Sequence, residues 1–190
     1  MNLSNNQILM LHKLLNHIES IGLSRLSGGK NIIAFSGGVD SSLVVKLLHI
    51  TFPENSIAVL GVSPSLSSYQ RELAHRVIKS IGSMPLIEVT TNEGSKDEYI
   101  ANNGNACFVC KSQLYSTLNQ IDDYLTKEVL VNNSKILLFN GTNKDDTYDS
   151  TRVGLGNLYL FIFVLIKNII ILQFYHNTIF LVIRIIYIRI

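Results

Sequence analysis

The residues best suited to chemistry in this chain form one short run: Ser36, Gly37, Gly38, Val39, Asp40, Ser41 and Ser42. The two glycines allow positive φ and let an anion approach the backbone closely. The three serines add hydroxyl donors, and a helix that begins here directs its first N–H groups and the positive end of its dipole at the same anion. The run therefore predicts a phosphate site. A plain glycine turn, capped by Asp40 or Ser41, is the alternative.

The sequence on either side indicates what this run connects. Ile32–Phe35 is apolar and rich in β-branched residues, which predicts a strand. After the run, four apolar residues recur at helical spacing: Leu43, Val44, Leu47 and Leu48. The run thus lies between a strand and a helix, although it has neither the lysine and spacing of a Walker A loop nor the third glycine of the dinucleotide fingerprint.

Strands and helices alternate along the remaining chain. Further apolar runs predict strands at Ile57–Val62, Leu86–Val89 and Ile136–Phe139, and helical spacing predicts helices at Asn5–Ile21 and Tyr69–Ile81. Such alternation favours an α/β fold with a doubly wound, Rossmann-like parallel sheet between helices, in three α/β/α layers. Ligands of such folds bind at the carboxyl ends of the strands.

Polar residues follow two more of these strands and are expected at the same edge of the sheet. Ser63 comes after the second strand and is predicted to lie beside a nucleotide base or ribose. Asp145 and Asp146 follow the last strand, where their carboxylates suit Mg²⁺ or the orientation of a substrate. A solvated turn is the other interpretation of this acidic pair.

Charge and cysteine content narrow the class of protein. Residues 1–155 carry 13 basic and 14 acidic side chains, so the net charge of +2 belongs to the end of the chain and no nucleic-acid partner is expected. Cys107 and Cys110 are the only cysteines, too close in sequence to staple a fold, and we expect a cytoplasmic protein. The pair fits half of a zinc or cluster site, a redox pair or partly buried thiols.

With these residues placed, SGGVDSS resembles the pyrophosphate-binding loop (PP-loop) of the ATP pyrophosphatase superfamily, which includes NAD synthase, GMP synthase, asparagine synthetase and several sulfur-inserting enzymes. Residues 31–155 are similar to one branch, the ATP-dependent sacrificial sulfur transferases of the LarE family. The matching features are FSGGVDSSL at Phe35–Leu43, Ser63-Pro64, the helix with Glu72 and Ala74, CxxCKxxLY at Cys107–Tyr115 and GTNKDD at Gly141–Asp146.

The resemblance implies an adenine nucleotide alpha-hydrolase-like fold, use of ATP and Mg²⁺, adenylation of a small carboxylate substrate with loss of pyrophosphate, and then sulfur transfer. It implies that pyrophosphate and metal are bound by Ser36, Gly37, Gly38, Asp40, Ser41 and Ser42, with Asp40 at the Mg²⁺. Cys107 and Cys110 match cysteines that hold an iron–sulfur cluster in some members. A homo-oligomer is also implied.

The sequence departs from the family pattern in three places. Asn140 stands where the family usually has Asp, Val153 where Pro usually follows Arg152, and no donor-cysteine segment follows residue 155. We therefore expect sulfur transfer to be incomplete in residues 1–190. Two other functions stay open: an amide-forming ligase of the NAD or GMP synthase type, and a non-catalytic nucleotide-binding fragment tethered to a membrane.

The composition changes at residue 156, and this change sets the predicted domain boundary. Residues 1–155 are expected to form the ATP-binding domain, truncated relative to the family. Residues 156–190 are dominated by Ile, Leu, Phe, Tyr and Asn and contain no acidic residue. Such a tail fits translated AT-rich noncoding sequence, or a membrane segment, since Leu158–Tyr175 approaches the roughly 20 residues that a span needs. Membrane association through this tail is the alternative location.

Overall fold

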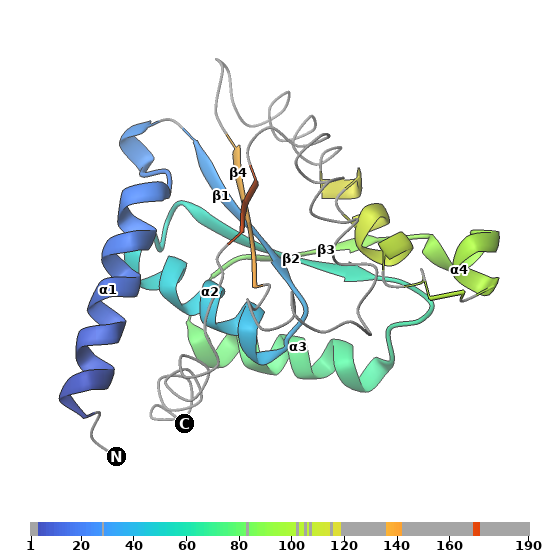
Figure 1. Cartoon of the computed structure of the whole chain (residues 1–190), viewed down its shortest axis with the longest axis horizontal. Coiled ribbons are helices and arrows are strands. Elements are labelled where there is room, and N and C mark those ends of the chain that lie inside the picture. The colour runs from blue at the N-terminus through green and yellow to red at the C-terminus, as the bar shows by residue number, and fades with distance from the viewer. Residues whose placement is uncertain are drawn as a thin grey trace.

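The sheet organises the structure, a computed structural model that describes residues 4–27, 29–82, 84–101, 103, 104, 106, 108–114, 116–118 and 136–141 and the backbone of 169–171. Its five strands are β1 (Lys30–Phe35), β2 (Ser56–Val62), β3 (Leu86–Thr90), β4 (Ile136–Asn140) and β5 (Ile169–Ile171). All neighbours are parallel, in the order β3-β2-β1-β4-β5 (Figure 1). The direction of winding reverses between β1 and β4, and ligands of open α/β sheets bind at such a switch point.

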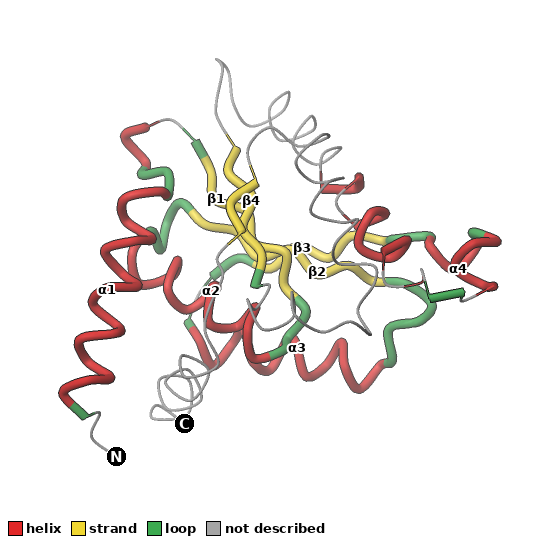
Figure 2. Tube along the Cα trace, viewed as in Figure 1, coloured by secondary structure: helices red, strands yellow, loops and turns green. Residues whose placement is uncertain are grey.

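Three helices cover one face of the sheet: α1 (Asn5–Ile21), α2 (Val39–Thr51) and α3 (Ser68–Ile81). Their apolar residues join one side of β1, β2 and β4 in a core that includes Ile33, Phe35 and Phe139. Side chains that point the other way, such as Ile32 and Val59, pack against a helical stretch at 108–114 and 116–118. Burial of each such side chain contributes about 1.5–3 kcal/mol. The predicted three-layer, doubly wound fold is therefore confirmed (Figure 2).

The helix starts differ in a way that matters for the site. Ser4 and Gln7 close the N-terminus of α1 with reciprocal side-chain and backbone hydrogen bonds, and Ser67 and Gln70 do the same for α3. Gly38 is the N-cap of α2 and provides no side-chain hydrogen bond. The N-terminal amides of α2 thus keep the capacity to bind an anion.

The predicted elements agree closely with the structure. The predicted strands all form, α1 has its predicted bounds, and the predicted helices at Ser41 and at Tyr69–Ile81 correspond to α2 and α3. The short helix α4 (Asp97–Ala101), the 3₁₀ turns η1 (Arg25–Ser27) and η2 (Glu93–Ser95) and the helical stretch at 108–114 and 116–118 were not predicted. Strand β5 lies in the apolar tail, whose other residues are outside the described ones.

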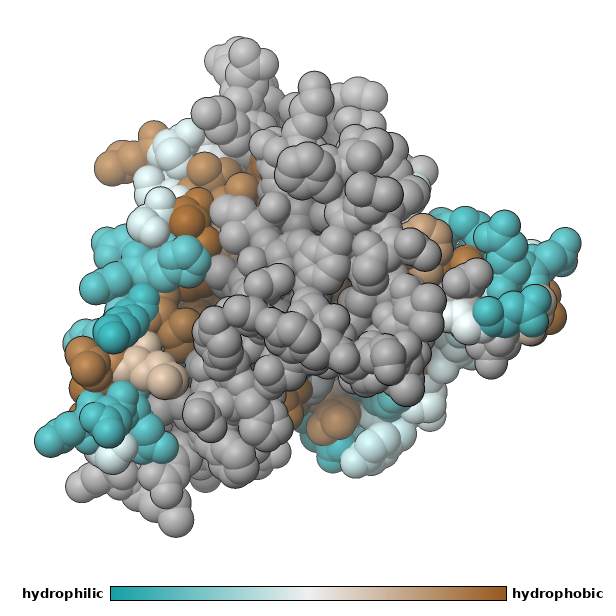
Figure 3. Space-filling model, in the orientation of Figure 1, coloured by the Kyte–Doolittle hydropathy of each residue, from teal (hydrophilic) through white to brown (hydrophobic). Residues whose placement is uncertain are grey.

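The surface over α1 is mixed in character. Figure 3 shows hydrophilic and hydrophobic side chains together on this side, and Ile8, Leu9 and Met10 are among the exposed apolar residues. Only Ile18 of this helix is fully buried, so α1 packs through a narrow stripe. Among the helices that the structure describes, none has both the length and the apolar character to cross a membrane.

Candidate functional site

Gly37 forms the bend between β1 and α2. Its φ is +76°, in the left-handed region that residues with a Cβ rarely adopt. A Cβ at Gly37 would also lie 2.9 Å from the Cα of Ala74, a fully buried residue of α3. The loop thus needs glycine both for its conformation and for its close approach to the neighbouring helix.

The serine hydroxyls of the loop form hydrogen bonds within it. Ser41 Oγ accepts a hydrogen bond from the backbone N–H of Ser36 at 3.3 Å, donates to the carbonyl of Gly38 at 3.1 Å and lies 3.2 Å from Ser36 Oγ. Ser42 is buried and donates to the same Gly38 carbonyl at 2.7 Å. The hydroxyls of Ser41 and Ser42 therefore both support the first turn of α2, and of the three serines Ser36 and Ser41 line the cavity at this loop.

The end of β4 packs directly on this first turn. A Cβ at Gly141 would lie 2.5 Å from the backbone nitrogen of Ser41 and 2.6 Å from the carbonyl carbon of Asp40. Only glycine allows the two backbones to come this close. The approach brings Asn140, which ends β4, next to the start of α2 at the switch point of the sheet.

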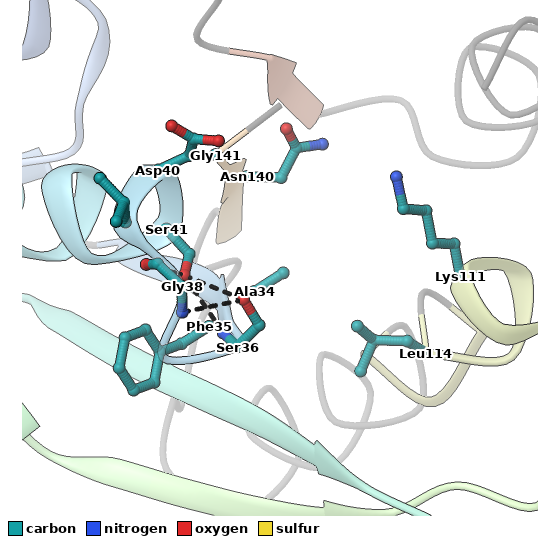
Figure 4. Close-up of a pocket in the computed structure, with 11 residues that line it drawn as sticks. Ala34, Phe35, Ser36, Gly38, Asp40, Ser41, Lys111, Leu114, Asn140 and Gly141 are labelled. Atoms are coloured by element: carbon teal, nitrogen blue, oxygen red, sulfur yellow. Dashed lines mark hydrogen bonds between the residues drawn. The ribbon is translucent and has the colours of Figure 1, made fainter. Parts of the chain in front are cut away.

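A cavity of about 230 Å³ opens at this position. It is lined by Ala34, Phe35, Ser36, Gly38, Val39, Asp40, Ser41, Lys111, Leu114, Asn140 and Gly141. Lys111 and Leu114 enter from the helical stretch at 108–114, across the cavity from the glycine loop (Figure 4). Leu114 approaches the sheet at Gly61, where a Cβ would lie 2.9 Å from its Cδ1. The cavity thus combines helix N–H groups, hydroxyls, a carboxylate and a lysine.

Two curated proteins match this chain in sequence, while no family model matches it. An uncharacterized protein of Synechocystis is 36% identical over 118 residues, which are 62% of this chain and 41% of that protein. Pyridinium-3,5-bisthiocarboxylic acid mononucleotide synthase of Lactiplantibacillus plantarum is 29% identical over 119 residues, 62% of this chain and 40% of the enzyme. The aligned part of the chain thus spans about two fifths of the length of these relatives.

Solved structures share the fold. NMN synthetase from Francisella tularensis superposes with a TM-score of 0.63 at 14% identity, covering 97% of this chain and 71% of that one. NH3-dependent NAD synthetase from Campylobacter jejuni, in complex with a nitrate ion, gives 0.59 at 17% identity, covering 96% and 74%. The resemblance to the PP-loop ATP pyrophosphatase superfamily is confirmed. The match to the Lactiplantibacillus enzyme supports the LarE-like branch.

The structure brings together four of the predicted PP-loop residues as lining of the cavity: Ser36, Gly38, Asp40 and Ser41. Gly37 and Ser42 do not line the cavity but stabilise the loop: Gly37 forms its bend, and Ser42 donates to the Gly38 carbonyl. Ser63 is not among the lining residues and bonds with Ser65 Oγ at 2.7 Å. Cys107, Asp145 and Asp146 lie outside the described residues, and no group of three His, Cys, Asp or Glu suited to a metal occurs among the residues that are described.

Three residues of this region were given no role from the sequence: Lys111, Asn140 and Glu93. Lys111 was noticed only as part of the CxxCK motif, and Asn140 only as a departure from the family pattern. Asn140 follows from the rule that ligands bind at the carboxyl ends of parallel strands, whereas Lys111 comes from the helical stretch at 108–114 and had no such signal. Glu93 in η2 is buried, with 1% of its surface exposed, and it follows β3 closely in the sequence.

Glu93 accepts hydrogen bonds from two different segments. Its Oε1 receives Ser65 Oγ at 3.5 Å and Cys110 Sγ at 3.6 Å. Burial raises the pKa of this carboxyl group, but hydrogen bonds from Ser63, from its own backbone N–H, from Thr91 and from Cys110 outweigh burial and hold the pKa below its ordinary value. Glu93 is therefore a buried, charged acceptor.

Proposed function

We propose that this chain binds ATP with Mg²⁺ at the PP-loop and activates a small carboxylate substrate by adenylation, as the first half of a LarE-like sulfur transfer. The observation that carries the proposal is the N-terminus of α2, which has no side-chain cap and opens into the cavity with Asp40 and Lys111 on its walls. Residues 1–155 are proposed to form the ATP-binding domain.

The phosphates of ATP suit the loop for electrostatic reasons. The first N–H groups of a 13-residue helix carry the positive end of its dipole, which stabilises a nearby anion. The hydroxyl of Ser36 supplies a further donor at the same edge of the cavity, and Ser41 holds Ser36 in place through its own hydrogen bonds. Lys111 adds a full positive charge from the opposite wall, which suits a leaving pyrophosphate.

The donor set also fits Mg²⁺, which prefers oxygen ligands and binds through one or two carboxylates together with substrate phosphates. Asp40 supplies a carboxylate on the first turn of α2, and the amide oxygen of Asn140 lies on the same cavity. A metal held there would neutralise phosphate charge. The chain's own part in the reaction is to orient the triphosphate, so that the substrate carboxylate attacks the α-phosphorus and the bond to the β-phosphate breaks.

The sulfur-transfer half rests on the resemblance. Cys110 is half-buried in the helix that carries Lys111, and its thiol donates to Glu93. An iron–sulfur cluster at Cys107 and Cys110 remains a proposal, as do a homo-oligomer and a cytoplasmic or membrane-associated location. The alternative function, an amide-forming ligase, is favoured by the fold of the NMN and NAD synthetases, which superpose over nearly the whole chain. AMP formation that requires ammonia would identify that alternative.

Calorimetry of the full chain with ATP, with and without Mg²⁺, tests the proposal. The wild-type protein should bind ATP in a Mg²⁺-dependent manner. Asp40→Asn should weaken the Mg²⁺-dependent part, and Lys111→Met should lower affinity roughly tenfold, the loss expected for one charged contact. Lys79→Met, at an exposed lysine of α3, is the matched control and should bind like wild type. Absence of ATP binding by a protein with a normal circular-dichroism spectrum would disprove the function.

A further inference from the structure

The buried carboxylate of Glu93 is hydrogen-bonded to two segments near the cavity. Glutamate is almost never fully buried unless it is paired. Glu93 is buried next to the cavity without lining it, so its charge does not reach a ligand directly. Its partners lie on the loop behind β2 and on the helical stretch at 108–114.

The helical stretch packs on the sheet through apolar side chains, among them Leu114 and the buried Leu118, and reaches Glu93 of η2 through Cys110. Leu114 fills the space left by the absent side chain of Gly61, an apolar contact that is less directional than a hydrogen bond. Cys110, one turn earlier, donates its thiol hydrogen to Glu93. A hydrogen bond to a charged acceptor is directional and stronger than a neutral one. Lys111 is the next residue, so the orientation that this bond sets also determines where Lys111 enters the cavity.

We propose that Glu93 is a positioning residue for nucleotide binding: through Cys110 it holds the helix so that Lys111 faces the PP-loop, and through Ser65 it holds the loop behind β2. This inference rests on the proposed function, because its effect is measured as the affinity of the chain for ATP. Glu93 itself touches neither phosphate nor metal. Its contribution is to restrict the positions that Lys111 samples before the nucleotide arrives.

A double-mutant cycle on the full chain tests this link, with Mg²⁺-ATP affinity as the readout. Glu93→Ala and Cys110→Ala should each weaken binding roughly tenfold, the loss expected for one hydrogen bond to a charged group. Glu93→Ala also releases Ser65, so the double variant should be no weaker than Glu93→Ala alone, in which the bond to Cys110 is already lost. Cys110→Ser retains a donor and should lose less affinity than Cys110→Ala. Glu98→Gln, at an exposed glutamate of α4, is the control.

Three results would overturn the proposal: losses that multiply in the double variant, equal losses for Cys110→Ser and Cys110→Ala, or unchanged affinity in Glu93→Ala. If Glu93→Ala does not fold, Glu93→Leu, which is closer in size to glutamate and has no acceptor, takes its place in the same cycle, with the same expected coupling to Cys110. Amide hydrogen exchange without nucleotide separates this inference from the proposed function. Glu93→Ala should speed exchange at 108–114 but not in α1, and unchanged exchange at 108–114 would refute the link even if the wild type binds no ATP.

Discussion

Replacement of Gly141 by alanine should damage the fold and the site together. The added Cβ would meet backbone atoms of Ser41 and Asp40 at 2.5–2.7 Å, and it would have to move away by about 0.9 Å to reach the 3.4 Å of an ordinary contact. Backbone atoms cannot avoid it by a change of rotamer, so β4 and α2 must separate. Overpacking of a core typically costs 1–3 kcal/mol, and we expect about 3 kcal/mol here because no side chain can yield.

Urea and thermal unfolding measure this cost. A loss of about 3 kcal/mol lowers Tm by roughly 6–12 °C in a domain of this size. Gly94→Ala is the matched control, because nothing lies within 4 Å of its Cβ position, and its stability should stay within about 0.5 kcal/mol of wild type. ATP affinity should fall in Gly141→Ala alone, since the displacement moves Asn140 away from Asp40. Equal stability and equal affinity of the two variants would refute the reasoning.

Three further predictions concern single side chains. Arg71 pairs with Glu88 and holds the pKa of that carboxyl group at about 2. The pair should therefore stabilise the fold above pH 4.5 and lose this effect as the pH falls from 4.5 toward 2. When the free energy of unfolding is measured against pH in this range, Glu88→Gln should show a shallower dependence than wild type. Asn140→Asp should strengthen Mg²⁺-dependent ATP binding several-fold, as calorimetry can measure, because it adds a second carboxylate to the cavity; unchanged Mg²⁺ dependence would contradict this. Ser41→Ala and Ser42→Ala should each lower stability by about 1 kcal/mol, because both hydroxyls are buried and donate to the Gly38 carbonyl, but only Ser41→Ala should also weaken ATP binding, because only Ser41 lines the cavity; equal affinities of the two variants would contradict the assignment.

The sequence predicted most of the fold because the central strands are apolar runs. Ile32–Phe35 and Ile136–Phe139 are buried on both faces of the sheet, so apolar content alone identifies them. The helical stretch at 108–114 and 116–118 was harder to predict. Its fully buried apolar residues, Val109 and Leu118, lie far apart in the sequence and show no helical period by themselves. The stretch is too short for an apolar pattern to identify it as a helix.

The site was predictable only where a local motif specifies it. Ser36 and Asp40 belong to such a motif, and the structure places both on the cavity. Glu93 sits in a run of Thr, Asn, Gly and Ser that is typical of a solvated loop, and its burial depends on Ser65 and Cys110, which are distant in sequence. Its place directly behind a predicted strand was the one local signal. Contacts of this kind are set by the tertiary fold.

The order of strands has a consequence for how the protein folds during synthesis. Strand β1 pairs on one side with β2, as Asn31 with Ser56, but on its other side with β4, as Lys30 with Ile136. The ribosome therefore completes the phosphate loop and α2 long before it delivers the strand that supports them. During that interval one edge of β1 has no partner strand, and such edges promote aggregation.

The late arrival of β4 also sets when the nucleotide can act as a folding ligand. Asn140 and Gly141 complete one wall of the cavity, so a nascent chain that ends before them has the glycine loop without its opposing backbone. If the chain binds ATP as proposed, the nucleotide would stabilise the finished sheet more than the nascent chain, because a ligand stabilises the state that binds it. Chaperones that shield an open strand edge would thus be needed most before residue 136 emerges.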